Sequence, residues 1–138
     1  MSATVGTRVV HRRYVPYSHA HYAGNLVDGA YSLGLFGDVA TEMRILTDGD
    51  EGLFASYSDV QFRAPVRAGD VLETSAELVK VGTRSRVMEF QVLVVARGEA
   101  TDANPGEGRP HGLYGAAFEQ ALEQIDTQGF QWGQSDGN

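Results

Sequence analysis

Apolar and polar residues alternate along three segments of the chain in the manner typical of half-buried β-strands. The segments are residues 53–63, 71–81 and 86–96, and short linkers at 64–70 and 82–85 separate them. Antiparallel hairpins are therefore the expected topology. The predicted inner faces are Phe54, Ser56, Ser58, Val60 and Phe62; Leu72, Thr74, Ala76 and Leu78; and Met88, Phe90, Val92 and Val94. Residues 7–15 form a weaker strand candidate.

A helical spacing of apolar residues precedes these strands and predicts one long helix over residues 26–46. Asn25 is the expected N-cap, and Asp28 completes a capping-box-like pair near the positive end of the helix dipole. Three helix glycines each cost about 1 kcal/mol relative to alanine, so we expect a sheet packed closely around them to offset that cost. The predicted buried face is Leu26, Ala30, Leu33, Phe36, Val39, Ala40, Met43 and Leu46, and the glycines are Gly29, Gly34 and Gly37.

The composition of the chain changes after residue 97. Residues 98–112 are rich in glycine, proline and small polar residues, which is typical of a linker. Residues 114–125 then place apolar side chains on one helical face, and residues 131–138 are expected to fray. We therefore expect a folded domain over residues 1–97, and a linker, a short C-terminal helix and a tail over residues 98–138.

Length, composition and charge narrow the class of protein. The chain has 138 residues, of which 42% are hydrophobic and 21% charged, as in a soluble protein of one domain. It lacks both an apolar run long enough to span a membrane and the apolar centre of a signal peptide, so a cytoplasmic location without a membrane partner is expected. Zero cysteines exclude disulfides and thiolate chemistry, and the net charge of −7 argues against a nucleic-acid partner.

Five motifs, in order, carry a resemblance to a known family: HAHYAGNLVDGA, LFGDVATE, DGDEGLF, VQFRAPVRAGD and VGTRSR. Across residues 7–97 the chain resembles the 3-aminobutyryl-CoA ammonia-lyases, which are also similar to β-alanyl-CoA ammonia-lyases. The resemblance implies an α+β hotdog fold, in which a curved antiparallel sheet wraps a long central helix. It also implies reversible loss of ammonia from a short 3-aminoacyl-CoA to give a 2-enoyl-CoA such as crotonyl-CoA, without an organic cofactor.

The stretch from residue 19 to residue 30 leads into the predicted helix and contains most of the candidate chemistry. Amides at a helix start can hold a thioester oxygen, and Gly24 and Gly29 would let a ligand approach the amides that follow Asn25. Asp28 and His21 lie where the thioester would arrive, and the resemblance favours a role for Asp28 in proton transfer. The structural alternatives are a solvated first-turn carboxylate and a hydrogen-bonded loop histidine.

Three further residues are catalytic candidates. Tyr22 is either a packed aromatic or a donor to the leaving amine. Glu51 lies in a charged turn, and the resemblance makes it a second carboxylate that a neighbouring subunit could supply. Asp38 is either a structural hydrogen-bonding group or a carboxylate of the other subunit's site. A homodimer or higher homo-oligomer with the site at its interface is expected, because an exposed sheet edge and a helix start can pair across a two-fold axis.

Metal binding is disfavoured by the spacing of the candidate ligands. His19 and His21 form an H-x-H pair, but His11 and His111 fall in a strand and a linker and complete no recognisable site. The turn at residues 48–52 lacks the acidic spacing, the glycine and the final glutamate of a calcium loop. No metal is expected.

An acyl-CoA substrate carries phosphates, so the acidic chain needs local positive charge. The cluster Arg84, Ser85 and Arg86 at the expected hairpin is the best candidate for substrate binding, with Arg63 and Arg67 in reserve. These arginines could instead be solvated residues on the hairpin surface, without a role in binding. Two other functions remain open: an acyl-CoA thioesterase that uses the same helix amides, and a non-catalytic acyl-CoA-binding protein.

Overall fold

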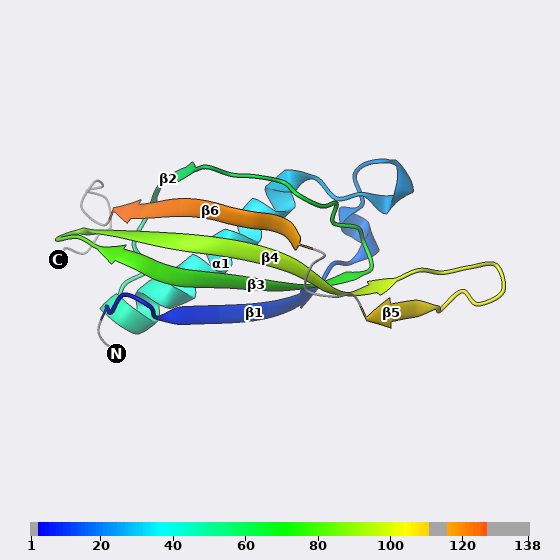
Figure 1. Ribbon diagram of the computed structural model, residues 1–138, viewed down its shortest axis with the longest axis horizontal. Helices are drawn as coiled ribbons and strands as arrows, with labels where there is room; N and C mark the ends of the chain where they lie inside the picture. The colour runs from blue at the N-terminus through cyan, green and yellow to red at the C-terminus, as the bar shows by residue number, and fades with distance from the viewer. Residues whose placement is uncertain (1–2, 111–115, 127–138) are drawn as a thin grey trace.

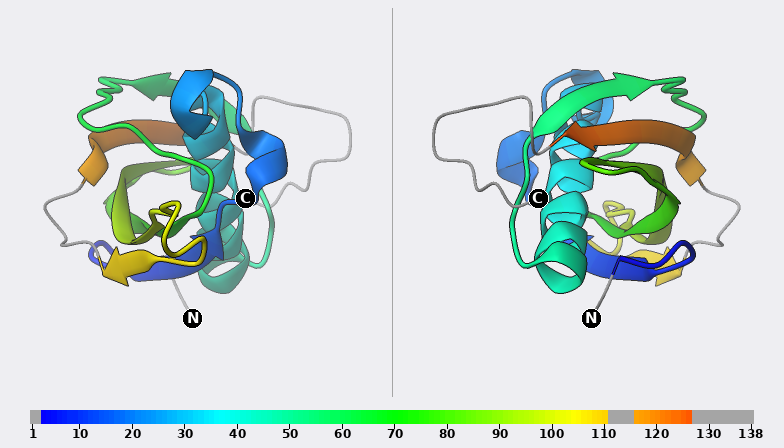
Figure 2. Two further views of the ribbon diagram at one scale, coloured as in Figure 1. Left: turned by 90° about the vertical axis from the view of Figure 1, so that its right-hand side faces the viewer. Right: turned by 90° about the vertical axis from the view of Figure 1, so that its left-hand side faces the viewer.

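One helix packs against one curved sheet in the computed structural model, which describes residues 3–110 and 116–126 (Figure 1). The helix α1 spans Gly29–Asp48 and follows two short 3-10 turns, η1 (Tyr17–His19) and η2 (Ala23–Asn25). The strands are β1 (Arg8–Tyr14), β2 (Phe54–Ser58), β3 (Asp70–Val81), β4 (Ser85–Gly98), β5 (Gly108–Pro110) and β6 (Ala116–Asp126). Figure 2 shows the strands curving around one side of α1. The predicted α+β class is confirmed.

The strands pair antiparallel in the order β1-β3-β4-β6-β2, and β5 pairs with one end of β4. β3 and β4 form the hairpin predicted from their short linker, while β1 pairs along β3 and confirms the weaker strand candidate. Alternation identifies the inner faces of the two long strands correctly, because the core lies on one side of each. All of the predicted inner residues are buried, namely Leu72, Thr74, Ala76 and Leu78 of β3 and Met88, Phe90, Val92 and Val94 of β4, and Asp70, Ser75 and Leu93 are buried in addition.

The predicted hairpin between residues 53–63 and 71–81 is wrong. β2 ends at Ser58 and pairs with β6 rather than with β3. Residues 59–69 instead connect β2 to β3 and run toward the end of the molecule where α1 begins (Figure 1). A short linker allowed a hairpin locally, but β2 pairs along the edge of β6 instead, with one register shift between Phe54 and Ser56.

The inner face predicted for residues 53–63 is also wrong, except at Val60, which packs against the core. Tyr57 is the residue that turns inward, with its ring centroid 6.3 Å from that of Phe90, whereas Phe54 and Phe62 are 39% and 59% exposed. Asp59 adopts a left-handed backbone (φ 53°), which ends the strand between Tyr57 and Phe62. The alternation of the sequence continues past this point although the strand does not.

The C-terminal part of the chain departs most from the prediction. In place of the short helix expected over residues 114–125, residues 116–126 form β6, which pairs with both β4 and β2. Pairing on both edges outweighs a local helical preference. The sheet thus continues past residue 97 and has the additional long strand that the sequence did not predict. Residues 127–138, including the tail expected to fray, lie outside the described part of the chain.

The expected linker after residue 97 is in fact a hairpin. Gly98 pairs with Gly108, Arg97 pairs with Arg109, and the Glu99 amide donates to the Glu107 carbonyl at 2.7 Å. The residues N-P-G at 104–106 lie at the tip of this hairpin, so the glycine and proline that suggested a linker serve as turn residues.

The helix begins three residues later than predicted. Asn25 has a left-handed backbone (φ 61°) and does not cap the helix. Asp28 is the N-cap instead, and its Oδ1 accepts a hydrogen bond from the Tyr31 amide at 3.1 Å. At the other end, Gly49 adopts φ 71° and donates to the Ile45 carbonyl at 3.0 Å, which is the usual left-handed helix stop.

The face of α1 that packs on the sheet matches the prediction in the middle of the helix and differs at its ends. Ala30 and Leu46 are exposed, while Arg44, which was not predicted to be inside, is buried. Close packing does not account for every glycine, because a Cβ at Gly34 would meet nothing within 4 Å. The predicted core residues of α1 that are buried are Phe36, Val39, Ala40 and Met43.

A nearly buried ion network ties the end of α1 to the β3–β4 hairpin. Asp48 accepts from Arg44 Nη1 at 2.7 Å and from Arg86 Nη2 at 2.7 Å. The side chains of Arg44, Asp48 and Arg86 are only 3%, 15% and 13% exposed, and Arg44 Nε is the one buried side-chain polar atom without a partner in the described part of the chain. Burial alone would raise the pKa of Asp48, but hydrogen bonds from Arg86 and Thr47 and the charges of both arginines lower it overall.

We predict that Asp48→Asn lowers the free energy of unfolding by about 3–5 kcal/mol at neutral pH, because it leaves two buried guanidiniums without a counter-charge. The folded-state pKa of Asp48 is depressed, so its contribution is present above the unfolded-state pKa and disappears as the pH falls through the folded value. Urea denaturation of both proteins at several pH values measures this. The two stabilities should converge in acid, and a constant difference down to the lowest pH would contradict the ionic explanation.

Candidate active site

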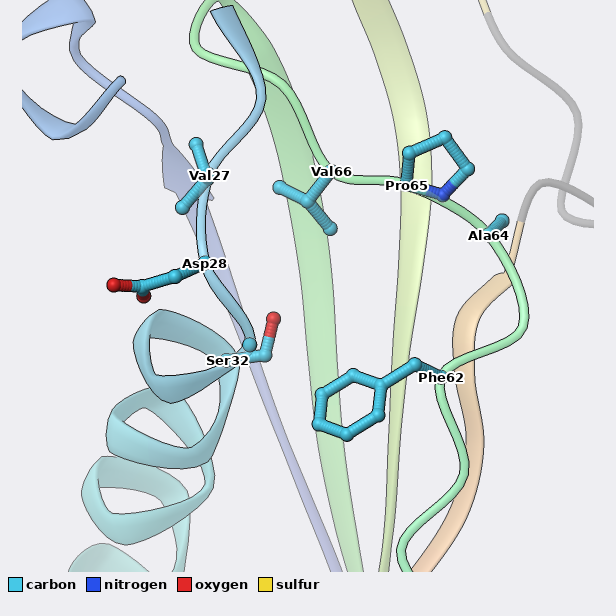
Figure 3. Close-up of a pocket in the computed structure, with 8 residues that line it drawn as sticks. Val27, Asp28, Ser32, Phe62, Ala64, Pro65 and Val66 are labelled. Atoms are coloured by element: carbon cyan, nitrogen blue, oxygen red, sulfur yellow. The ribbon is translucent and has the colours of Figure 1, made fainter. Parts of the chain in front are cut away.

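A small pocket opens beside the start of α1 (Figure 3). It has a volume of about 150 Å³ and is walled mainly by apolar side chains. Two chain segments supply these walls: one enters the helix, and the other connects β2 to β3. The lining residues are Val27, Asp28, Gly29, Ser32, Phe62, Ala64, Pro65 and Val66.

Backbone hydrogen bonds hold the two walls together. The Val27 amide donates to the Val66 carbonyl at 2.9 Å, and the Ala68 amide donates to the Asn25 carbonyl at 2.9 Å. These contacts, with an isolated bridge between Leu26 and Arg67, make a short antiparallel ladder just before the helix. The position of residues 62–66 beside the helix start therefore depends on this ladder.

The second wall is anchored by a buried ion pair. Asp70 is fully buried, and its two oxygens accept from Arg97 Nε at 2.8 Å and Nη2 at 3.0 Å. The Arg67 amide also donates to Asp70 at 2.8 Å, and Arg97 Nη2 donates to the Pro65 carbonyl at 3.1 Å. The hydrogen bond to Asp70 is the main reason that the pKa of Arg97 is raised. Asp70 lies in the AGD motif, but sequence reasoning gave it no role.

Gly29 allows the two walls to touch. A Cβ at this position would stand 2.4 Å from Cε1 of Phe62, well inside van der Waals contact. Gly29 was predicted to let a ligand approach the helix start, and in the structure it lets the ring of Phe62 approach. The phenyl ring thereby becomes a wall of the pocket (Figure 3).

Two kinds of polar group surround the pocket. The Tyr31 amide donates a hydrogen bond to the Asp28 side chain. The amides of Gly29 and Ala30 have no partner among the described residues, as expected of the first amides of a helix. Figure 3 shows the Asp28 carboxylate on one side of the helix start and the Ser32 hydroxyl on the other, toward Phe62 and Val66. A carbonyl oxygen at the helix start would thus find donors between these two side chains.

The remaining candidates from the preceding loop lie close by but are exposed. His21 and Tyr22 pack edge to face with ring centroids 4.4 Å apart, and Tyr22 is 57% exposed. Gly24 and Asn25, the predicted substrate-binding residues of this loop, belong to η2 and are also exposed. Asn25 contributes its backbone carbonyl to the ladder that holds the pocket. The structure thus gathers this group at the helix start.

Two predicted carboxylates lie elsewhere in the chain. Glu51 follows the end of α1, and a helix of 20 residues separates it from Asp28 by about 30 Å. Asp38 lies roughly 15 Å along the helix axis from Asp28, is exposed, and receives a hydrogen bond from Arg13 at 3.3 Å. Asp38 therefore has a partner on β1, which is the structural role that the sequence left open.

The predicted phosphate-binding cluster also lies away from the pocket, at the β3–β4 hairpin. Arg84 is exposed and Ser85 begins β4. Arg86 is not available for phosphate, because its guanidinium donates to Asp48 and to the carbonyls of Gly82 and Ser85. Since Arg86 joins this hairpin to Asp48, the cluster lies at the end of α1 opposite the pocket.

Sequence reasoning predicted only Asp28 and Gly29 among the residues that line the pocket, and it missed Ser32 and Phe62. Ser32 is 1% exposed and sits four residues after Asp28, a spacing that could have indicated a side chain near the same helix end. Phe62 was assigned to a strand face. Among the described residues, no group of three or more acidic or histidine side chains could hold a metal ion, and no helix is long and apolar enough to cross a membrane. His111 lies outside these residues.

The helix, its curved sheet and the pocket at the helix start define a hotdog protein. The family model of the thioesterase superfamily matches residues 25–101, and the chain belongs to this superfamily. A curated 3-aminobutyryl-CoA ammonia lyase of Acetoanaerobium sticklandii is 51% identical over 86 residues, which cover 61% of this chain and 68% of the relative. The resemblance predicted from the five motifs is confirmed.

The chain is also similar to solved structures, in one case over nearly its whole length. The β-alanyl-CoA:ammonia lyase from Clostridium propionicum aligns with a TM-score of 0.80 at 32% identity, covering 96% of this chain and 94% of that one. An acyl-CoA hydrolase from Staphylococcus aureus, in complex with butyryl coenzyme A, aligns with a TM-score of 0.64 at 16% identity and covers 88% and 66%. The likeness to the hydrolase shows the shared fold alone.

We predict that Gly29→Ala weakens binding of butyryl-CoA roughly tenfold, because the new methyl group displaces the ring of Phe62 at an overpacking cost of about 1–2 kcal/mol. Titration calorimetry measures the affinity. In a Phe62→Ala background, the same Gly29→Ala change should have little further effect, since the clashing ring is gone. Additive losses in the double variant would show that the two residues act separately.

Proposed function

We propose that this protein is a 3-aminoacyl-CoA ammonia-lyase, which reversibly converts a short 3-aminoacyl-CoA into a 2-enoyl-CoA and ammonia. The observation that carries the proposal is the 51% identity, over 86 residues, to the 3-aminobutyryl-CoA ammonia lyase. The same kind of activity is named for the β-alanyl-CoA:ammonia lyase, whose fold extends over nearly the entire chain. No organic cofactor is part of the proposal.

The helix start supplies the stabilisation that the reaction needs. Removing a proton from C2 of a thioester builds negative charge on the thioester oxygen, and an oxyanion site must meet it. The amides of Gly29 and Ala30 have no partner among the described residues and stand at the positive end of α1. These amides hold the oxygen and lower the energy of the enolate. They replace the amides following Asn25 as the oxyanion donors.

Asp28 is the base of this proposal. Its Oδ1 is used in the helix cap, which leaves Oδ2 to take a proton. Asp28 takes the proton from C2, the electron pair forms the C2–C3 double bond, and the substrate ammonium leaves as ammonia with the C–N electron pair. Among the predicted carboxylates, Asp28 alone lies at the helix start of its own chain. His21 and Tyr22 are close enough in sequence to assist with the amine.

The pocket suits a short acyl chain. Its volume of about 150 Å³ is below the roughly 300–1,000 Å³ of sites for drug-sized ligands. Its apolar walls, including Phe62 and Val66, accommodate the hydrocarbon and keep water away from the enolate. A four-carbon acyl group of the 3-aminobutyryl or crotonyl type fits this description.

A second copy of the chain completes the site in our proposal. Glu51 and Arg84 lie at the same end of the molecule, because Arg86 links the hairpin to Asp48, three residues before Glu51. A two-fold axis that sets two α1 helices antiparallel would bring this end of one subunit to the helix start of the other. Glu51 then binds the ammonium, and Arg84 meets a phosphate of CoA.

Thioester hydrolysis is the alternative that the same amides would support, and it accords with the thioesterase family model. We predict that incubation with crotonyl-CoA and ammonium removes the enoyl absorbance without releasing thiol, because ammonia adds across the double bond and the thioester stays intact. Recording enoyl absorbance and free thiol separately tests this. Thiol release would instead establish a hydrolase, because hydrolysis destroys the conjugated thioester as well. Unchanged absorbance without thiol release would indicate an acyl-CoA-binding protein.

We predict that Asp28→Asn lowers kcat for ammonia elimination about 10²–10⁴-fold, as expected from the loss of a general base, while butyryl-CoA still binds. Asparagine retains the N-cap, so the folded variant isolates the charge from the helix-starting role. Glu51→Gln and His21→Gln are measured beside it, and Asp38→Asn is the matched control because Asp38 pairs with Arg13. Normal turnover in Asp28→Asn would show that another residue is the general base.

Mixing the inactive variants tests whether the site is shared between subunits. In a mixed dimer of Asp28→Asn and Glu51→Gln chains, one site carries both changes and the other carries neither. Random exchange should then restore about a quarter of the wild-type activity in a two-fold dimer. If each site uses both residues of one chain, mixing restores nothing.

A further inference from the structure

One polar side chain in the pocket has no partner. Ser32 is 1% exposed, and its hydroxyl forms no hydrogen bond with any residue that the structure describes. Figure 3 shows the hydroxyl on the side of the helix facing Phe62 and Val66, away from the Asp28 carboxylate. The pocket thus holds a nearly buried hydroxyl aimed at apolar walls.

This arrangement is costly in the absence of a ligand. A buried hydroxyl that loses its hydrogen bonds to water is destabilising unless another group replaces them. A serine in a helix commonly bonds back to a carbonyl of the preceding turn, yet no such bond is found for Ser32 in the described part of the chain. The Ser32 hydroxyl is not among the fully buried unpaired atoms of the described residues, so it keeps slight contact with the pocket, and the occupant of the pocket supplies its missing partner.

The position of Ser32 indicates which part of the ligand it meets. Ser32 lies three residues beyond Gly29, or roughly 4.5 Å further along the helix axis than the first oxyanion amide. In an acyl chain, C1 and C3 are about 2.5 Å apart, and a substituent on C3 reaches roughly 1.5 Å further. A thioester oxygen held by the amides of Gly29 and Ala30 thus places C3, rather than C1, near the serine.

We propose that the Ser32 hydroxyl accepts a hydrogen bond from the 3-amino group and makes the pocket selective for 3-amino over unsubstituted acyl chains. This inference rests on the proposed function, because it takes the thioester to be held at the helix start. Ser32 and Asp28 then approach the substrate from opposite sides: one holds the leaving group and the other takes the C2 proton. The apolar neighbours of Ser32, Phe62 and Val66, contact the hydrocarbon of the same chain.

The test compares binding of two esters to Ser32→Ala. Titration with 3-aminobutyryl-CoA and with butyryl-CoA, using an Asp28→Asn background to prevent turnover, separates the amine contact from the rest of the acyl group. We expect Ser32→Ala to weaken 3-aminobutyryl-CoA about 10- to 100-fold, the effect of removing a hydrogen bond to a charged group, and butyryl-CoA less than twofold. Ser32→Thr, which keeps the hydroxyl, should retain most of the preference for the amine.

Ser56→Ala is the matched control, because Ser56 is an exposed serine on β2 outside the pocket, and it should leave both affinities unchanged. Equal weakening of the two esters by Ser32→Ala would overturn the proposal and assign the hydroxyl to the thioester or to folding. Unchanged affinities would overturn it as well. These binding data need no catalysis, so a wild-type protein that fails to eliminate ammonia would refute the proposed function while the preference for the amine is still measured.

Discussion

The buried pair of Asp70 and Arg97 is the interaction on which the rest of the site depends. A fully buried carboxylate must have its charge compensated, and here a guanidinium and a backbone amide satisfy it. Arg97 also donates to the Pro65 carbonyl, so one side chain of β4 fixes both ends of the 65–70 turn. That turn supplies Val66 to the ladder with Val27 and brings Phe62 to the helix start. The shape of the pocket is thus determined by a contact outside it.

The two ends of α1 differ in how their polar groups are paired. The C-terminal end is held by structural contacts, and the N-terminal end borders the pocket. At the C-terminal end, Gly49 and Thr47 satisfy helix carbonyls and Asp48 joins two arginines. At the N-terminal end, the Asp28 cap satisfies the Tyr31 amide, while the amides of Gly29 and Ala30 have no partner among the described residues. A helix of 20 residues also keeps groups at its two ends about 30 Å apart. Glu51 and Arg84 can therefore serve a helix-start site only from another subunit.

Sequence patterns identified the elements whose surroundings are uniform along their length. β3 and β4 have the core on one face throughout, so alternation predicted their buried residues and their hairpin. The prediction was wrong where distant partners decide the local structure: residues 116–126 pair with two strands instead of forming a helix, and Asp59 turns the chain out of β2. In the candidate site, the cluster at the helix start was predicted. The structural role of Arg86 was not, because it depends on Asp48, which lies 38 residues away in the sequence.

Similar folds in lyases and hydrolases raise the question of what selects the reaction, since a helix start polarises a thioester carbonyl in either case. Hydrolysis must deliver water to C1, whereas ammonia elimination must take a proton from C2 and hold nitrogen on C3. In our proposal, the groups around this pocket follow the acyl chain: amides for the oxygen, Asp28 to one side, and Ser32 one turn further along the helix. The walls between them are apolar, which disfavours a bound water beside C1. In our proposal, the chemistry is thus set by polar groups placed beyond the carbonyl, on a helix start that the fold provides in any case.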